Sequence, residues 1–241
     1  LEQGRLLAQE TSSLWLARYP NQRAWLSAEL GDWDTAYEFD LTGLHPAQDV
    51  PGFREIEIST VINLVLDCTA LGRLQEAGSF LAEAQRDLGR PEFGSHNWRW
   101  RIRLADARAR LSLAQDNLEL AAGSISDLLE QAQKMRARKY TARGLVLRGQ
   151  VHLSQGSFSP AEADLRTALV LADNLCYFPA RVEARLRLSH VYKQAGLAEQ
   201  AKGHAAEATD LVAGLGARLQ HPELRSSFER GIGNQLQQIE L

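Results

Sequence analysis

This sequence lacks long apolar runs and any segment that resembles a leader. Nowhere do its residues include the roughly 18 consecutive apolar side chains that a membrane-spanning helix needs. The first ten residues, "LEQGRLLAQE", have no basic region followed by an apolar core, so we predict no signal peptide. They also contain no Met, and we expect the chain to be a fragment of a larger protein.

Cysteines are scarce. Cys68 and Cys176 are the only two in 241 residues, and neither belongs to a Cys-x-x-Cys motif. Isolated thiols of this kind are typical of reduced, buried cysteines in a cytoplasmic protein. We therefore expect a cytoplasmic protein.

Motifs of catalysis and of metal or nucleotide binding are also missing. The six histidines form no His-Glu-x-x-His motif and have no Cys at ligand spacing. There is no Gly-x-x-x-x-Gly-Lys-Ser/Thr loop and no Gly-x-Ser-x-Gly elbow. We therefore expect no enzymatic activity, no metal and no cofactor.

Strand signals are few as well. The longest β-branched cluster, "EIEISTVINLVL", alternates for only a few residues before a helical pattern replaces it. Most of the chain repeats apolar residues at steps of three and four, as a helix with one buried face does. We predict an all-α protein of about eleven or twelve helices.

Glycine is present in a recurring motif. An apolar residue follows the glycine by two positions, and an Ala follows it by five. The copies are Gly31, Trp33 and Ala36; Gly72, Leu74 and Ala77; Gly156, Phe158 and Ala161; Gly196, Ala198 and Ala201; with Asp116, Leu118 and Ala121 as a degraded copy. Successive copies begin 40 to 44 residues apart, which indicates an internal repeat.

Each copy is expected to form the elbow of an antiparallel helix pair. Glycine ends the first helix because it adopts the left-handed conformation at no steric cost. Small residues before and after most elbows, such as Gly149 and Ala168, let two backbones approach closely. In "SFSPAEADL", we expect Ser159 to cap the second helix and Pro160 to occupy its first turn. Pairs this small must stack on one another to bury their apolar faces.

This pattern over residues 21–230 resembles the tetratricopeptide repeat, although the family's usual period is about 34 residues. The resemblance implies one domain, residues 1–241, built as a right-handed α-solenoid of about five helix pairs. Residues 1–20 would be a partial repeat helix that ends before Pro20, 21–217 the repeats, and 218–241 a capping helix and tail. Loops are expected at 45–55 and 89–97. Such long helices are similar to those in large bacterial signal-transduction and transcription regulators.

Acidic residues are rare in the predicted first helices of the C-terminal pairs. Residues 1–95 hold 7 basic and 15 acidic side chains, whereas residues 96–241 hold 20 and 15. Helices predicted at 96–112, 136–153 and 179–194 together carry 14 basic and 2 acidic residues. The resemblance places first helices on a concave wall, so we predict a partly basic groove that attracts acidic ligands. The alternative is that these basic residues pair with acidic neighbours on adjacent helices.

Counting back from the elbows gives the inward positions of these three helices, and two residues lie one turn farther out. The predicted ligand-binding residues are Arg99, Arg103, Arg110, Lys139, Arg143, Gln150, Glu183 and His190. Arginine suits carboxylate or phosphate ligands because its guanidinium presents two parallel donors.

We expect a module that binds a protein or an acidic peptide in this groove, within a larger bacterial regulatory protein. The alternative is a nucleic-acid-binding repeat, since "HNWRWRIR" interleaves Trp with Arg. The net charge of −3 argues against it, and the spacing of Trp98 and Trp100 from later apolar residues is typical of a buried helix face. Self-association through an uncovered N-terminal end is a third hypothesis.

Overall fold

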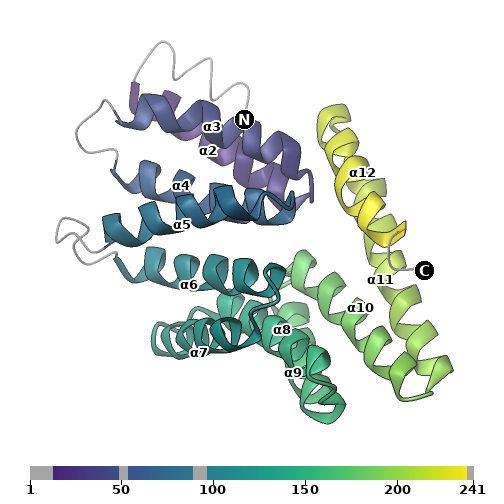
Figure 1. Cartoon of the computed structure of the whole chain (residues 1–241). Helices are drawn as coiled ribbons and strands as arrows, with labels where there is room; N and C mark the ends of the chain where they lie inside the picture. Colours follow the sequence, from purple (N-terminus) through teal and green to yellow (C-terminus); the bar gives the residue numbers. More distant parts are fainter. Residues whose placement is uncertain (1–12, 49–53, 89–96, 238–241) are drawn as a thin grey trace.

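The computed structural model describes residues 13–48, 54–88 and 97–237, whose regular structure is entirely helical (Figure 1). The helices in these ranges are α2 (Ser13–Glu29), α3 (Trp33–Gln48), α4 (Arg54–Ala70), α5 (Leu74–Leu88), α6 (Asn97–Ala114), α7 (Leu118–Lys134), α8 (Arg138–Ser154), α9 (Phe158–Asn174), α10 (Phe178–Gln194), α11 (Ala198–Arg218) and α12 (Pro222–Gln237). The predicted all-α fold class is confirmed.

Helices α2 to α11 pack as five successive pairs: α2 with α3, α4 with α5, α6 with α7, α8 with α9, and α10 with α11. Each second helix also packs against the first helix of the next pair. The first helices α2, α4, α6, α8 and α10 touch one another in sequence, and the second helices of the described chain make no comparable contacts. The first helices therefore form the inner layer of an α-solenoid, as predicted.

Small residues at the repeat positions lie where helices meet. Ala24 and Ala109 in first helices and Ala168 in a second helix are fully buried. At Gly149 in α8 an added Cβ would lie 2.8 Å from Cγ of Leu165 in α9, closer than packed side chains come. Glycine is therefore required for the close approach of these two helices.

A residue with left-handed backbone conformation follows the end of seven helices. Four are the glycines of the repeat motif, with φ between 70° and 79°, and the other three are Asp116, Arg136 and Cys176, with φ of 57°, 53° and 50°. From Asp116 onward such a residue occurs every 20 positions, so the turns between pairs have the same geometry as the turns within them. The repeat motif included Asp116, which stands at the 40–44-residue spacing of the copies, but not Arg136 and Cys176, which lie midway between copies and are not glycines.

The turn hydrogen bonds explain this shared geometry. At the α8–α9 turn the N–H of Ser157 donates to the carbonyl of His152 over 2.8 Å, and that of Gly156 donates to Leu153 over 3.0 Å. At the α9–α10 turn Tyr177 and Cys176 make the same two bonds. This closure satisfies the last carbonyls of each helix.

The first predicted helix end is wrong. Helix α2 continues through Pro20 to Glu29, across the expected boundary at residue 20. Pro20 lacks the N–H for one helical hydrogen bond, but it packs against Gly43 of α3, where an added Cβ would lie 3.1 Å from the Pro20 Cβ. Packing against α3 thus stabilises a helix that local sequence preference would interrupt.

Two other boundaries also differ from the predictions. Helix α3 extends to Gln48, so Pro46 lies in its last turn and the loop expected at 45–55 is partly helical. The reason is that α3 packs against both α2 and α4, and this packing outweighs the tendency of proline to end a helix. Most of the loop expected at 89–97 lies outside the described residues.

The predicted cap of α9 is also wrong. The residue before α9 is Ser157, not Ser159, and it forms no side-chain cap bond. The tight turn after Gly156 leaves one residue before the helix begins.

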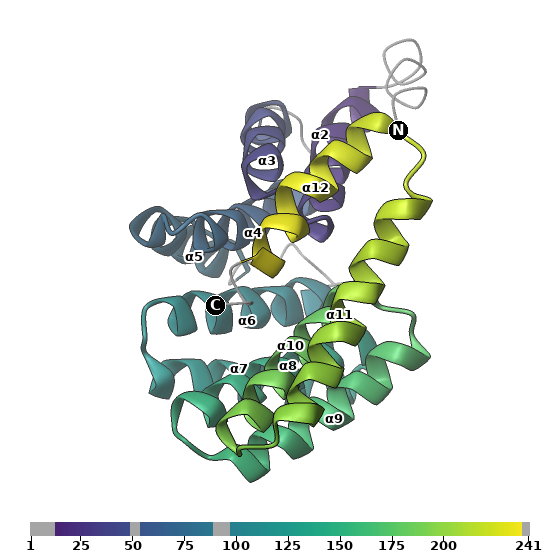
Figure 2. The same ribbon diagram turned by 90° about the vertical axis from the view of Figure 1, so that its right-hand side faces the viewer.

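Helix α12 links the two ends of the solenoid (Figure 2). Its Phe228 and Ile232 share a buried apolar cluster with Leu30 at the end of α2 and with residues of α10 and α11. Asp32 accepts hydrogen bonds from Ser227 over 2.6 Å and from Arg230 over 2.7 Å. The predicted C-terminal capping helix therefore covers the last helix pair and also reaches the first.

Candidate functional site

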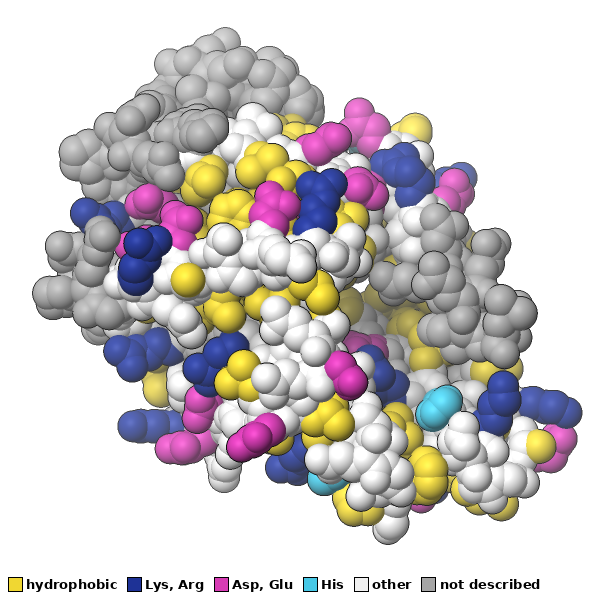
Figure 3. Space-filling view, viewed as in Figure 1, with side chains coloured by type: hydrophobic (Ala, Val, Ile, Leu, Met, Phe, Trp, Pro, Cys, Tyr) yellow, Lys and Arg dark blue, Asp and Glu magenta, His cyan; other side chains and the backbone are white. Residues whose placement is uncertain are grey.

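The inner helices surround a cavity of about 1600 Å³, which we call the hollow. Its wall comes from α2, α4, α6, α8 and α10, and α12 contributes one side. Figure 3 shows its opening, with acidic and basic side chains close together on the wall. Segments more than 200 residues apart in sequence thus contribute to one site, for example Gln22 and Arg230.

All eight residues predicted from the inward positions lie on the wall of the hollow. They are Arg99, Arg103, Arg110, Lys139, Arg143, Gln150, Glu183 and His190. The same counting rule, applied to the first two elbows, would have added Trp25, Ser59 and Leu66, which also lie on the wall, and Arg18, which does not. Whether these residues bind a ligand stays a prediction.

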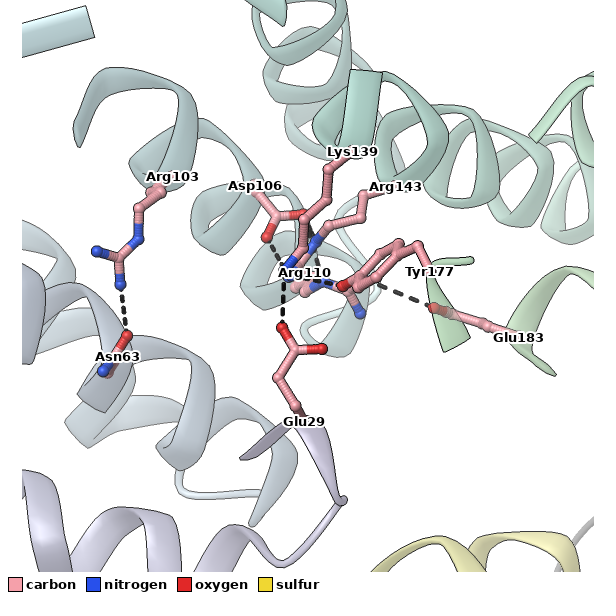
Figure 4. A network of polar contacts seen from close by, with 9 residues as sticks. All are labelled: Glu29, Asn63, Arg103, Asp106, Arg110, Lys139, Arg143, Tyr177 and Glu183. Carbon is pink, nitrogen blue, oxygen red and sulfur yellow. Dashed lines mark hydrogen bonds and ion pairs between the residues drawn. The ribbon is translucent and has the colours of Figure 1, made fainter. Parts of the chain in front are cut away.

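Asp106 of α6 is the centre of the charge network in the wall (Figure 4). It is 1% exposed and accepts hydrogen bonds from Nε of Arg110 over 3.4 Å and Nε of Arg143 over 3.2 Å. Arg143 also donates to the hydroxyl of Tyr177 over 3.3 Å. Burial lowers the pKa of Arg143, but the charge of Asp106 opposes this, so its pKa lies well above the ordinary value. The network therefore keeps Arg143 charged and ties α6 to α8 and α10.

Glu183 of α10 carries a second part of the network. Its carboxylate lies 3.7 Å from Arg110 and 2.9 Å from Arg187. Burial raises the pKa of Glu183, but the charges of the two arginines more than offset this effect and lower the pKa to about 2. The carboxylate is therefore ionised at neutral pH.

Lys139 at the start of α8 is held from across the hollow. Its Nζ donates to Glu29 of α2 over 2.9 Å and lies 4.4 Å from the ring centroid of Tyr177 and 5.5 Å from that of Trp25. This ion pair joins helices whose residues lie 110 positions apart in sequence. The Trp25 side chain remains 47% exposed beside it.

Arg103 connects the wall to a buried polar cluster. It donates to Asn63 over 2.6 Å and to Ser59 over 2.8 Å, both on α4. Asn63 in turn donates to the buried carboxyl group of Asp40 over 3.3 Å. Burial lowers the pKa of Arg103, and its partners here are neutral amide and hydroxyl groups.

Asp40 and Asp67 form a buried carboxyl pair, and Asp67 also lines the hollow. Burial raises the pKa of Asp40 to about 8, although hydrogen bonds from Asn63 and Asn21 lower it in part. Burial and then the charge of Asp40 raise the pKa of Asp67 to about 9. Two carboxylates in contact cannot both ionise cheaply, so the pair holds a proton at neutral pH.

Most cations of the predicted basic helices have acidic partners. Besides the wall network, Arg108 lies 2.5 Å from Asp127, Arg148 2.7 Å from Asp164, and Arg181 2.6 Å from Asp173. Each of these pairs joins a first helix to a second helix. This arrangement favours the alternative, in which acidic neighbours neutralise the basic rows and little of the wall remains positive.

The counting rule missed the acidic and aromatic members of the network: Glu29, Asp106 and Tyr177. Asp106 gave a signal, because it is the single acidic residue among five arginines in residues 96–112. Glu29 gave none, because its pairing with Lys139 depends on how far the solenoid curves.

Among the described residues, no cluster of three or more His, Cys, Asp or Glu side chains is arranged to hold a metal ion. No helix in the described ranges has the length and apolarity needed to cross a membrane.

Neither a model of a known protein family nor the sequence of a curated protein matches this chain. A solved structure does: that of BtubC (BKLC) from P. vanneervenii, with a TM-score of 0.60 and 19% sequence identity. The match covers 92% of this chain and 90% of that one. At this identity the likeness concerns the fold alone.

Proposed function

We propose that this protein is a protein-binding module that holds a peptide or a domain of a partner protein in the hollow. The hollow, at about 1600 Å³, exceeds the roughly 300–1000 Å³ of small-molecule pockets. Its length along five inner helices suits an extended segment better than a compact metabolite. The resemblance to tetratricopeptide arrays further supports a role within a cytoplasmic bacterial regulator.

The observation that carries this proposal is a set of wall side chains with unused binding capacity. Gln150 and His190 line the hollow and form no hydrogen bond with another side chain of the described chain, and Trp25 is 47% exposed. Around them the charged groups are fixed by ion pairs. A peptide could therefore bond to free polar groups and pack on Trp25 without displacing a salt bridge.

Binding peptides can be selected from a display library of random 12-residue sequences, and their dissociation constants measured by fluorescence anisotropy. We expect His190→Trp, which fills the hollow, to weaken binding roughly tenfold or more. Gln133→Trp places the same bulk on exposed α7, outside the hollow, and should leave the dissociation constant unchanged.

The reverse pattern, with loss only in Gln133→Trp, would show that the hollow is not the binding site. The nucleic-acid alternative is tested by titrating salt against a labelled random oligonucleotide. Tight binding that weakens steeply with salt would support that alternative instead.

A further inference from the structure

A second cavity of about 660 Å³ adjoins the hollow, and we call it the basic cavity. It lies among α2, α4, the first turns of α6 and α8, and the turn before α8. Its charged residues are Arg18, Arg99, Arg103, Arg136, Arg138 and Lys139, with Glu55 as the single carboxylate. Unlike the hollow, this cavity has a large excess of positive charge.

Three of these cations have no acidic partner within the part of the chain that the structure describes. Arg99, Arg136 and Arg138 are exposed and form no ion pair with a described residue. Lys139 is neutralised by Glu29, whereas Arg103 is bonded to the uncharged Ser59 and Asn63. Elsewhere in the basic helices most arginines are ion-paired, so unpaired positive charge is concentrated here.

The start of α8 adds further positive potential. This helix begins at Arg138, and its cap residue Ala137 provides no side-chain hydrogen bond to the first-turn N–H groups. The N–H groups of Arg138 and Tyr140 already donate to the carbonyls of Arg136 and Ala137, so it is the helix dipole that favours an anion at this position. Ala137 and Arg138 both line the basic cavity, so the helix terminus and the unpaired guanidinium groups share one space.

The aromatic residues of the cavity are committed to the protein itself. Trp98 packs against the apolar cluster around Ile102, and Trp100 against the cluster around Val61. The guanidinium of Arg103 lies 5.2 Å from the ring centroid of Trp100. Stacking platforms for nucleic-acid bases are therefore already occupied, which favours a compact anionic group over a nucleic acid.

A phosphate monoester matches this arrangement better than one carboxylate does. It has close to two negative charges and three acceptor oxygens at neutral pH. One such group can accept bonds from several arginines together, whereas a carboxylate is satisfied by a single bidentate arginine. A volume of about 660 Å³ also suits one side chain better than a long acidic segment.

We propose that the basic cavity binds a phosphorylated side chain of the partner protein, held by Arg99, Arg136 and Arg138 at the start of α8. This inference rests on the proposed function, because the phosphate belongs to a segment that continues into the hollow. The two cavities share seven lining residues, among them Arg99, Arg103 and Lys139, so one peptide can occupy both.

The probe is a fluorescent pool of nine-residue peptides with a central phosphoserine among random uncharged residues. Matched pools have Ser or Glu at the centre. We expect the phosphoserine pool to bind roughly tenfold more tightly than either matched pool. This comparison uses the unmodified protein, so it does not depend on how any variant folds.

The residues are tested with a triple variant, Arg99→Gln, Arg136→Gln and Arg138→Gln, which should lose the preference for phosphoserine. The control is Arg101→Gln, Lys134→Gln and Lys193→Gln, which removes the same charge from exposed positions outside both cavities and should keep the preference.

Four results would overturn the proposal: equal binding of the phosphoserine and Ser pools, equal binding of the phosphoserine and Glu pools, equal loss in both triple variants, or tighter binding of a twelve-residue thymidine oligonucleotide. Peptides selected for the hollow carry no phosphate. If one of these four results occurs while those peptides still bind and respond to His190→Trp, the phosphate inference fails and the proposed function stands.

Discussion

At the scale of single residues, burial decides which charges matter. Asp106 lies between Arg110 and Arg143 on two helix pairs, while Asp127 makes an equally direct ion pair with Arg108 at the surface. The Asp106 side chain is 2% exposed and that of Asp127 is 54% exposed. Water screens the second pair but not the first.

We expect Asp106→Asn to lower the free energy of unfolding by about 3 kcal/mol, because it leaves the partly buried guanidinium of Arg143 without its anion and leaves Arg110 with Glu183 alone. Asp127→Asn removes a carboxylate of the same type from an exposed pair and should cost at most about 1 kcal/mol. Urea denaturation of both variants measures the difference. Equal costs would mean that Asp106 does not organise the wall.

The buried pair of Asp40 and Asp67 predicts how stability depends on pH. The folded-state pKa values, about 8 and about 9, lie above the ordinary value of 3.8, so the folded protein binds more protons than the unfolded chain. The protonated pair makes its full contribution to the free energy of unfolding below the ordinary pKa of 3.8. This contribution is lost as the pH rises through the folded-state pKa values. The urea midpoint should therefore fall between pH 5 and pH 9.

Asp67→Asn should make this fall shallower and should be more stable than the unmodified protein at pH 9. The reason is that a neutral amide replaces a carboxyl group that must stay protonated. Urea midpoints at pH 5, 7 and 9 test this. Asp210→Asn changes an exposed carboxylate and should follow the unmodified protein; if Asp67→Asn also does, the pair does not control the pH dependence.

At the scale of helices and turns, one left-handed residue ends each of seven helices. Sequence reasoning found the helix pairs because glycine holds four of these positions. It did not find the turns at Arg136 and Cys176, where the backbone adopts the same conformation against the preference of the side chain. Tertiary packing of neighbouring helices holds these residues in place.

The same substitution should therefore have opposite effects at two glycines. Gly156→Ala should destabilise the protein by about 1 kcal/mol, because φ is 70° there. Gly123→Ala, inside α7, should stabilise it by roughly 0.5–1 kcal/mol. Neither added Cβ meets an atom within 4 Å, so differential scanning calorimetry reports the backbone effect alone. A change of the same sign in both variants would contradict this account of the turns.

At the scale of the whole molecule, α12 turns a curved stack into a structure that surrounds a hollow. The closure depends on a close approach: a Cβ on Gly231 would lie 2.3 Å from the carbonyl oxygen of Leu30. Arg23 of α2 also lies 3.4 Å from Glu223 of α12. Few contacts hold this end, so it should open more readily than the helix pairs.

We expect Gly231→Ala to separate α12 from α2. Amide hydrogen exchange in α12 should then rise on the order of tenfold, and small-angle scattering should give a larger radius of gyration. Gly214→Ala in α11 is the control, because its added Cβ meets no atom within 4 Å. Unchanged exchange in Gly231→Ala would show that the contact with Leu30 does not hold the closure.

The sequence by itself determined the helices, their pairing and the inward row, because apolar period, turn residues and side-chain direction are local properties. The resemblance to tetratricopeptide repeats supplied the concave wall, and the elbow spacing then predicted that Arg103, Arg143 and Gln150 lie on it, as they do. Only the tertiary structure decided the contacts of Lys139 with Glu29 and of α12 with α2. These depend on curvature, which accumulates from small rotations between successive helix pairs. The unpaired positive charge in the basic cavity was also decided by the tertiary structure, because it depends on which acidic side chains the packed helices bring near each arginine.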